Sequence, residues 1–342
     1  FRRVLFRSVL ALVGLIMGLA AAFEIRMSPR LNIMVYGYFP HNWTQHLRGG
    51  GFRPVVFFEH ALRLAIFLCM AAIAVIAYFR ASNGERRALF FLAALFLVAV
   101  LFLSRSFGIA LIALLLVPLA FVLPPRAQIG FAAICVALVT LYPAMKALGF
   151  NPLTAVTPLL EAFRPDRVHS FTYRLQEGDE ILAHVRDKPI FGWGIYSRWE
   201  ATDPNGGTAI VPDALWIIIV ARYGWVGYFA YYGLIFMPVV LLWAATRDRP
   251  PSAALAGLTM ILAANALDLI PNSAVTPLTM LVAGAIMGHL DRLRQEDGQV
   301  SAETATTAAP EAAALRTSRP RNRAATVMTA AQATAATPSA QA

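Results

Sequence analysis

The sequence RPDRVHSFTYRLQEGDEILAHVRDKPIFGWG, residues 164–194, is unlike the chain around it. It lies within one polar passage, Pro143 to Asp213, that carries charges of both signs and several aromatic residues. Apolar runs long enough to cross a bilayer flank this passage on both sides. A loop of roughly seventy residues is too long for a simple connection. We therefore expect a large loop that works at a membrane surface and is held there by spanning helices.

The composition indicates a protein that crosses a membrane several times. Of 342 residues, 58% are hydrophobic and only 14% are charged, whereas about a quarter of the residues of a soluble domain are charged. The formal net charge is +10, but no groove-reading motif accompanies it, so we expect no nucleic-acid partner. Cys69 and Cys135 both lie in apolar runs and suggest neither a disulfide framework nor a metal site.

The apolar runs predict an all-α, polytopic integral membrane helical bundle with about eight transmembrane helices and one large periplasmic loop. The runs lie at about 9–23, 55–79, 88–103, 107–123, 127–142, within 214–245, 253–270 and 276–290. The chain then divides into helices 1–5 with a periplasmic loop at 24–54 (residues 1–142), the large loop (143–213), helices 6–8 (214–294) and a tail (295–342).

Arginines in the short loops predict the orientation. If the helices alternate, all of these loops fall on one side, which the positive-inside rule assigns to the cytoplasm. The arginines of these loops are Arg2, Arg3, Arg80, Arg86, Arg87, Arg126, Arg247, Arg249, Arg292 and Arg294. The large loop then lies in the periplasm, together with residues 24–54, 104–106 and 271–275.

The C-terminal tail is rich in Ala, Thr, Pro and Gln from about Glu296 onward. It shows no apolar periodicity and buries too little surface to offset its ordering entropy. We expect a disordered cytoplasmic tail, with a late amphipathic helix as the alternative.

Three arginines, Arg53, Arg105 and Arg174, fall on the periplasmic face in separate turns. Arginine keeps its charge and presents a planar fork of donors that suits phosphate. The alternative is that these side chains anchor helix ends near lipid headgroups. The phosphate-binding interpretation is strongest for Arg105, because a two-helix hairpin needs no cation in its short turn.

Other polar groups stand near helix ends and have two interpretations each. Glu59 and Arg63 are spaced to pair on one helix face, and His60 between them is a candidate substrate-binding or proton-carrying group. Asp213 is suited to cap the following helix or to act as a carboxylate base toward an acceptor hydroxyl.

Asp268, with Asn265, is either a polar helix terminus or a second base or arginine partner. Trp193 between Gly192 and Gly194 suggests an aromatic presented by a tight turn, and we include it with Arg186 among the candidate substrate-binding residues. No nucleotide loop, nucleophile elbow or metal cluster is visible, so we expect no cofactor and no metal.

Two short stretches resemble a known family. They are Lys188-Pro-Ile-Phe-Gly-Trp-Gly194 and Tyr223-Gly-Trp-Val-Gly227, preceded by the turns around Arg53 and Arg105 and the loop with Arg174. The pattern, over roughly residues 48–290, resembles the O-antigen ligase and O-antigen polymerase superfamily of bacterial envelope glycan enzymes.

The resemblance implies metal-independent, inverting glycosyl transfer on the periplasmic face. The donor would be a glycan on undecaprenyl pyrophosphate, and the acceptor a hydroxyl of a glycan or of a lipid-linked molecule at the membrane. Arg105 and Arg174 would neutralise the pyrophosphate leaving group. The ligases of this superfamily have a histidine where this chain has Asp213, which favours polymerisation or another transfer over lipid A-core ligation. Members of the superfamily usually have about a dozen spans, so we expect further N-terminal spans.

Two alternatives remain open at this stage. A transporter or flippase for an anionic lipid-linked sugar predicts internal repeats and broken helices at mid-membrane depth, and no repeat is visible. A non-catalytic membrane scaffold predicts that the basic groups are scattered around the periphery.

Overall fold

The computed structural model describes residues 2–40, 42–163, 165–196, 199–200, 212–247, 249–273 and 275–317. The chain forms two compact units, Phe1–Leu290 and Asp291–Ala342. Within the described ranges the secondary structure is helical, apart from one two-stranded antiparallel hairpin that pairs β1 (Leu47–Arg48) with β2 (Gly51–Phe52). The turn of this hairpin is Gly49-Gly50, both with positive φ, which glycine adopts without strain.

The bounds of the helices are α1 Arg2–Met27, α2 Leu31–Tyr36, α3 Ala61–Ala81, α4 Glu85–Leu103, α5 Phe107–Val122, α6 Pro125–Ala147, α7 Thr157–Phe163, α8 Pro165–Val185, α9 Leu215–Ala245, α10 Ala253–Asp268 and α11 Pro277–Thr317, with the short 3-10 turns η1 Trp43–His46 and η2 Pro152–Val156. The long apolar helices follow the predicted runs, whereas α2, α7 and α8 lie outside them and α11 extends beyond its run.

Among the described residues, five helices are long and apolar enough to span a membrane: α1 from Val9, α3, α4, α6 and α9. Helices α5 and α10 are apolar but shorter. Helix α6 contains Pro143 and continues to Ala147, past its expected end at Tyr142, because neighbouring helices satisfy the backbone groups that a proline frees. The expected all-α, polytopic membrane protein is confirmed.

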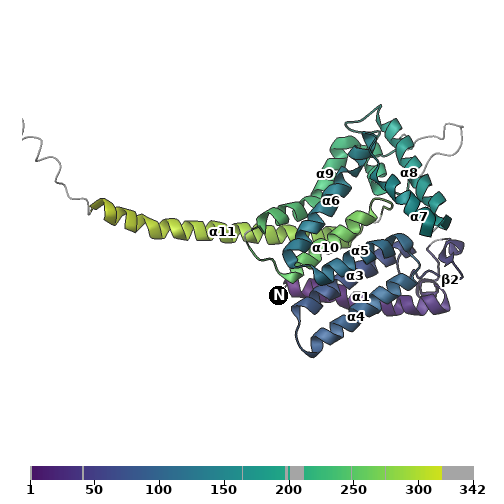
Figure 1. Ribbon diagram of the computed structural model, residues 1–342, viewed down its shortest axis with the longest axis horizontal. Coiled ribbons are helices and arrows are strands. Elements are labelled where there is room, and N and C mark those ends of the chain that lie inside the picture. The colour runs from purple at the N-terminus through teal and green to yellow at the C-terminus, as the bar shows by residue number, and fades with distance from the viewer. Residues whose placement is uncertain are drawn as a thin grey trace, which may run out of the picture. The chain divides into compact units, whose positions relative to one another are not determined.

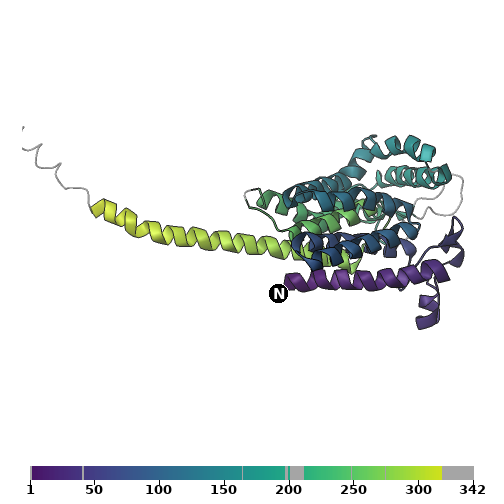
Figure 2. The ribbon, with the colours of Figure 1, turned by 60° about the horizontal axis from the view of Figure 1, so that its bottom comes forward.

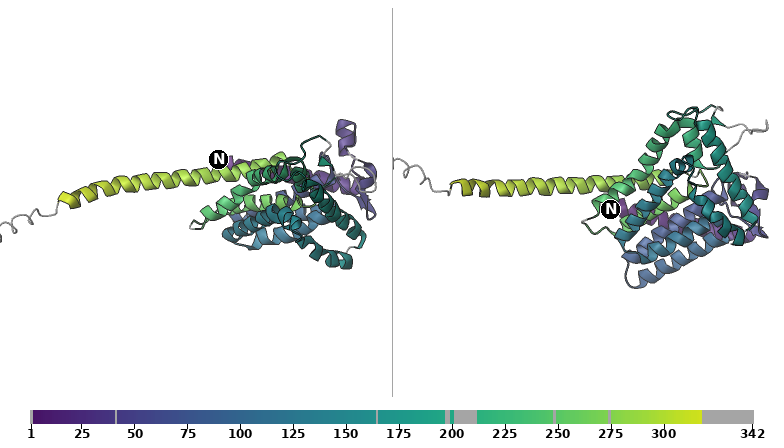
Figure 3. Two further views of the ribbon diagram at one scale, coloured as in Figure 1. Left: turned by 90° about the horizontal axis from the view of Figure 1, so that it is seen from above. Right: turned by 45° about the horizontal axis from the view of Figure 1, so that its top comes forward.

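Helix α10 lies between two groups of helices in the first unit (Figure 1). One group contains α1, α3, α4 and α5, and α1 runs along its edge (Figure 2). The other contains α6 and α9, and α8 packs on both (Figures 1 and 3). Helix α3 is the centre of the core, since nearly every residue from Leu64 to Ala77 is buried.

A buried carboxylate ties the loop after α1 to the start of α3. Glu24 is fully buried near the end of α1. Its Oε1 accepts a hydrogen bond of 2.9 Å from the amide of Leu31, and its Oε2 accepts bonds of 2.8 and 2.7 Å from the amides of Val55 and Val56. Because these amides are held by Glu24 and Val56 has φ +54°, the helix begins at Ala61 and not near residue 55 as expected.

The large polar passage is more ordered than a plain loop. Its described part contains η2, α7 and α8, and α7 pairs with α8 (Figure 1). At the other end of the chain, α11 continues through Thr317, beyond the point where we expect a disordered tail. Alanine, the strongest helix former, is frequent there. Residues 318–342 lie outside the described part.

Candidate active site

Helix α8 and the segment just before α9 are joined by an ion pair between two of the predicted catalytic residues. The Nη2 of Arg174 lies 2.9 Å from the Oδ2 of Asp213, to which it donates a hydrogen bond. The side chain of Asp213 is 61% exposed and that of Arg174 is 33% exposed. Both groups are therefore paired and still open to a molecule at this surface.

Asp213 does not cap α9. The N-cap is Ala214, which makes no side-chain hydrogen bond. The first helical amide, that of Leu215, instead donates to the carbonyl of Asn272 at 3.0 Å. The expectation of an Asp213 cap is therefore wrong, because the helix begins one residue later than that role requires. The Asp213 carboxylate instead pairs with Arg174.

Glu177 is a member of this cluster that the sequence did not single out. It lies one helical turn after Arg174 and is only 5% exposed, and it accepts a hydrogen bond from the Tyr173 hydroxyl. Burial raises the pKa of the Glu177 carboxyl, and the charge of Asp213 raises it further, against the opposing effects of Tyr173 and Arg174. The buried carboxyl of Glu177 and the exposed carboxylate of Asp213 thus both lie near Arg174.

Lys146 fixes α8 onto α6 and was also missed. Its Nζ lies 2.6 Å from the Oδ1 of Asp179 and donates to the carbonyl of Leu175 at 2.8 Å. Gly178 permits this approach, since a Cβ there would stand 2.9 Å from the Lys146 side chain and 3.2 Å from the ring of Trp216. A lone lysine at the end of an apolar helix gives no sequence signal for such a contact.

Arg53 and Arg105 meet at the β1–β2 hairpin. Arg53 is buried, with 1% exposure, and its Nη2 donates to the Ser106 hydroxyl at 3.1 Å. Arg105 is exposed and donates to the carbonyls of Arg48, at 2.5 Å, and Gly49. Its guanidinium lies against Gly51, where any side chain would overlap it.

The contacts of the described residues thus gather the four principal site residues in two groups: Arg174 with Asp213, and Arg53 with the turn that carries Arg105. The further expectation, that all four line one cavity, stays a prediction.

The two family-like stretches form one backbone joint, which comprises Pro189–Gly194 and Ala221–Val226. Helix α9 is broken at Gly224 (φ +66°, ψ −170°), which leaves helical carbonyls and amides without partners inside the helix. The amides of Trp193 and Gly194 donate to the carbonyls of Ala221 and Arg222 at 2.9 and 2.8 Å.

In return, the amides of Trp225 and Val226 donate to the carbonyls of Pro189 and Ile190 at 2.8 and 3.3 Å. The two segments approach so closely that a Cβ on Gly192 would lie 2.5 Å from the Gly224 nitrogen. Backbone packing therefore explains Gly192 and Gly224, one glycine in each stretch.

Trp193 is held by its neighbours. His184 stacks on it with ring centroids 4.4 Å apart and an interplanar angle of 7°. Its indole N–H donates to the His184 carbonyl at 3.1 Å, and the Nζ of Lys188 lies 4.5 Å from the ring centroid. Nearby, the exposed Arg186 lines a cavity of about 160 Å³ with Lys146, Asp179 and Trp225.

The remaining candidates lie at helix ends. His60 is the N-cap of α3, and its Nδ1 accepts from the Leu62 amide at 3.1 Å. The expected pair of Glu59 and Arg63 is confirmed at 2.7 Å.

Asp268 is fully buried at the end of α10. Its Oδ1 accepts from the Asn272 side chain at 2.7 Å, and Asn265 accepts from Thr279 at 3.0 Å. Within the described ranges Asp268 makes no ion pair with an arginine, and its Oδ2 is buried without a hydrogen-bond partner.

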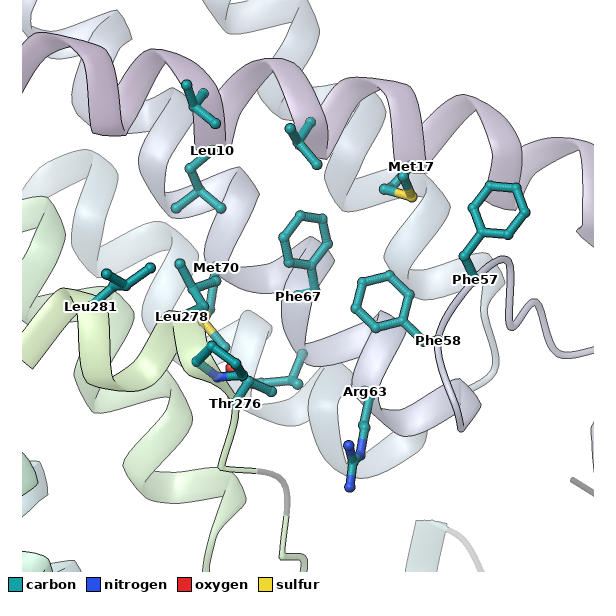
Figure 4. Close-up of a pocket in the computed structure, with 14 residues that line it drawn as sticks. Leu10, Met17, Phe57, Phe58, Arg63, Phe67, Met70, Thr276, Leu278 and Leu281 are labelled. Atoms are coloured by element: carbon teal, nitrogen blue, oxygen red, sulfur yellow. The ribbon is translucent and has the colours of Figure 1, made fainter. Parts of the chain in front are cut away.

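An apolar cavity of about 420 Å³ lies between α1, α3 and the start of α11. Figure 4 shows Leu10, Phe58 and Leu278 among the side chains around it, with Arg63 at one end. Within the described part of the chain, no group of three or more His, Cys, Asp or Glu residues is placed to hold a metal ion.

The fold and these polar groups define a polytopic membrane protein with a charged site on its large loop. Residues 88–232 match the family model described as O-antigen ligase. This match covers α4 to the kinked α9, including the backbone joint, Arg105, Arg174 and Asp213. This match agrees with the resemblance to the O-antigen ligase and O-antigen polymerase superfamily seen in the sequence, and it supports glycan processing of the type found there. Searches of the curated proteins and of the solved structures found no match.

Proposed function

We propose that the protein transfers a glycan from an undecaprenyl-pyrophosphate carrier to an acceptor hydroxyl. The reaction takes place at the periplasmic face of the bacterial inner membrane and needs no metal, and it makes or attaches an envelope polysaccharide. The observation that carries the proposal is the solvent-accessible Arg174–Asp213 pair, with Asp213 exposed and Arg174 partly exposed, inside the region that matches the O-antigen ligase family.

The chemistry of the pair suits this transfer. When the glycosidic bond to the carrier breaks, negative charge develops on the pyrophosphate, and a guanidinium fixed beside it stabilises that charge. Asp213 is the acceptor's base: it takes the hydroxyl proton as the oxygen attacks the anomeric carbon from the opposite face, which inverts the configuration. On donor binding Arg174 exchanges part of its contact with Asp213 for the phosphate.

Two other features support a lipid-linked donor. Arg105 is exposed at the Gly49-Gly50 turn and presents a second cation. The apolar cavity between α1, α3 and α11 has the lining that a segment of a polyprenyl chain requires.

The test is glycan elongation or transfer by the reconstituted protein, with a purified undecaprenyl-pyrophosphate glycan as donor. Arg174→Ala should lower the rate by a factor on the order of a hundred to a thousand. Asp213→Asn keeps a hydrogen-bond acceptor for Arg174 but loses the base, so the loss should be on the order of a hundredfold or more. Asp213→His should retain activity, since the resemblance places a histidine there.

Glu180→Gln is the matched control, because Glu180 is an exposed carboxylate on the same helix. Full activity of Asp213→Asn would overturn the base assignment. Full activity of Arg174→Ala would overturn the role of the cation. No transfer by the unaltered protein from any such donor would overturn the proposed function.

A further inference from the structure

The loop after α8 exposes a cluster of large apolar side chains. Ile190, Phe191, Ile195 and Tyr196 are all exposed, Phe191 at 75% and Tyr196 at 81%. Leu148, 88% exposed, follows Ala147, which lines the same cavity as Pro189. We call Leu148, Ile190, Phe191, Ile195 and Tyr196 the interfacial patch. A cluster of exposed large apolar side chains on a polar loop marks an interaction site.

The backbone joint fixes the depth of this patch relative to the membrane. After the break at Gly224, α9 continues without a second break in φ/ψ from Trp225 to Ala245 and ends beside Arg247. At 1.5 Å per residue this segment is about 31 Å long, which equals the thickness of a bilayer's hydrocarbon core. The joint therefore lies at one membrane boundary when Arg247 lies at the other.

The patch continues the lipid-facing surface of α9. Tyr223, Val226 and Phe229 are exposed on this helix around and beyond the break. The Val226 amide donates to the Ile190 carbonyl at 3.3 Å, so the exposed side of the helix and the patch adjoin. The same surface thus leads from the membrane-spanning helix onto the loop.

The residue types match the headgroup boundary of a bilayer. Phenylalanine and tyrosine side chains concentrate where hydrocarbon meets headgroups, and long cationic side chains place their charge among phosphates. Arg186 and Lys188 are exposed just before the patch in the chain. Four large apolar side chains within residues 190–196 would be unfavourably exposed if this loop faced only water.

We propose that the interfacial patch inserts into the headgroup–acyl boundary of the leaflet opposite Arg247, and that Arg186 and Lys188 contact lipid phosphates there. The loop from Pro189 to Tyr196 is then a membrane anchor, and the hydrogen bonds of the backbone joint attach it to α9. This surface is independent of the glycosyl-transfer chemistry proposed above.

The experiment measures depth directly. The two native cysteines, Cys69 and Cys135, are buried, so Phe191→Cys and the control Glu180→Cys are each labelled with an environment-sensitive fluorophore and reconstituted in vesicles that contain anionic lipid. The unaltered protein, treated with the label in the same way, gives the background. The label at position 191 should be quenched by a lipid carrying a nitroxide near its headgroup and protected from aqueous iodide. The label at position 180 should behave in the opposite way.

Quenching of both labels by iodide alone would overturn the proposal. Protection of position 191 from both quenchers would also overturn it, since the patch would then be covered by protein. If Phe191→Cys does not fold, Tyr196→Cys reports on the same loop. Because the readout is depth and not transfer, a protein without the proposed enzymatic activity still tests the anchor.

Discussion

Gly224→Ala should be among the most damaging single-methyl substitutions in this chain. Gly224 has φ +66° and ψ −170°, a region that is essentially reserved for glycine and costs other residues about 1–3 kcal/mol. The added Cβ would also overlap the carbonyl group of Ile190. Backbone cannot rotate away as a flexible side chain can, so the two segments of the joint must part.

The loss can be estimated from the contacts at the joint. Four backbone hydrogen bonds cross it, and each contributes about 1 kcal/mol net. Added to the backbone strain, their loss should lower the free energy of unfolding by about 5–7 kcal/mol. Gly194→Ala carries only the strain of its positive φ, because no atom lies within 4 Å of its Cβ position, and should cost about 1 kcal/mol.

Gly233→Ala is the matched control on the same helix. No atom lies within 4 Å of its Cβ position and its φ is not positive, so alanine should be neutral or stabilising by up to about 1 kcal/mol. The assay is equilibrium unfolding of the purified protein in detergent micelles, followed by tryptophan fluorescence, since Trp193 and Trp225 lie at the joint. A Gly224→Ala protein within about 1 kcal/mol of the unaltered one, or one no worse than Gly233→Ala, would refute the backbone argument.

Three further predictions concern buried charge. Glu24→Ala leaves the two buried amides of Val55 and Val56 and the part-buried amide of Leu31 without their acceptor, and it should lower the free energy of unfolding by about 3 kcal/mol or more; an unchanged denaturation midpoint would contradict this. Burial raises the pKa of the Glu177 carboxyl above its ordinary 4.5, so the folded protein holds the extra proton and stability falls as pH rises from 4.5 through the folded pKa. Glu177→Gln should remove that fall, and melting temperatures across this range test it, with an unchanged slope as the contrary result. Lys146→Met removes the Nζ donor to the Leu175 carbonyl and should cost about 1–3 kcal/mol, because the exposed Asp179 is rehydrated. Asp179→Asn leaves the buried Lys146 ammonium without its counter-charge and should cost more in the same denaturation series; a smaller loss than that of Lys146→Met would contradict this.

Local sequence was enough to locate the long apolar helices, but not α7 and α8 in the large polar passage. A backbone in hydrocarbon must satisfy its hydrogen bonds within each segment, so an apolar run of sufficient length becomes a helix whatever its neighbours are. The runs at 88–103 and 107–123 correspond to α4 and α5 within a few residues. The differences arise where another group competes for the backbone, as Glu24 does for the amides of Val55 and Val56.

The candidate site was only partly accessible from the sequence. The residue types Arg174 and Asp213 stand out in a polar loop, and the glycine stretches carry the family pattern. That Arg174 meets Asp213, that Glu177 is buried beside them and that Lys146 reaches α8 depends on helices far apart in the chain.

The sequence alone determined the all-α membrane class, the positions of the apolar helices and the family resemblance, because hydropathy and backbone glycines act locally. The tertiary structure alone decided which polar groups meet. It buries Arg53 against Ser106 and leaves Asp213 free of capping. The physical reason is that such partnerships depend on how helices separated by dozens of residues pack against one another, and no local pattern encodes that packing.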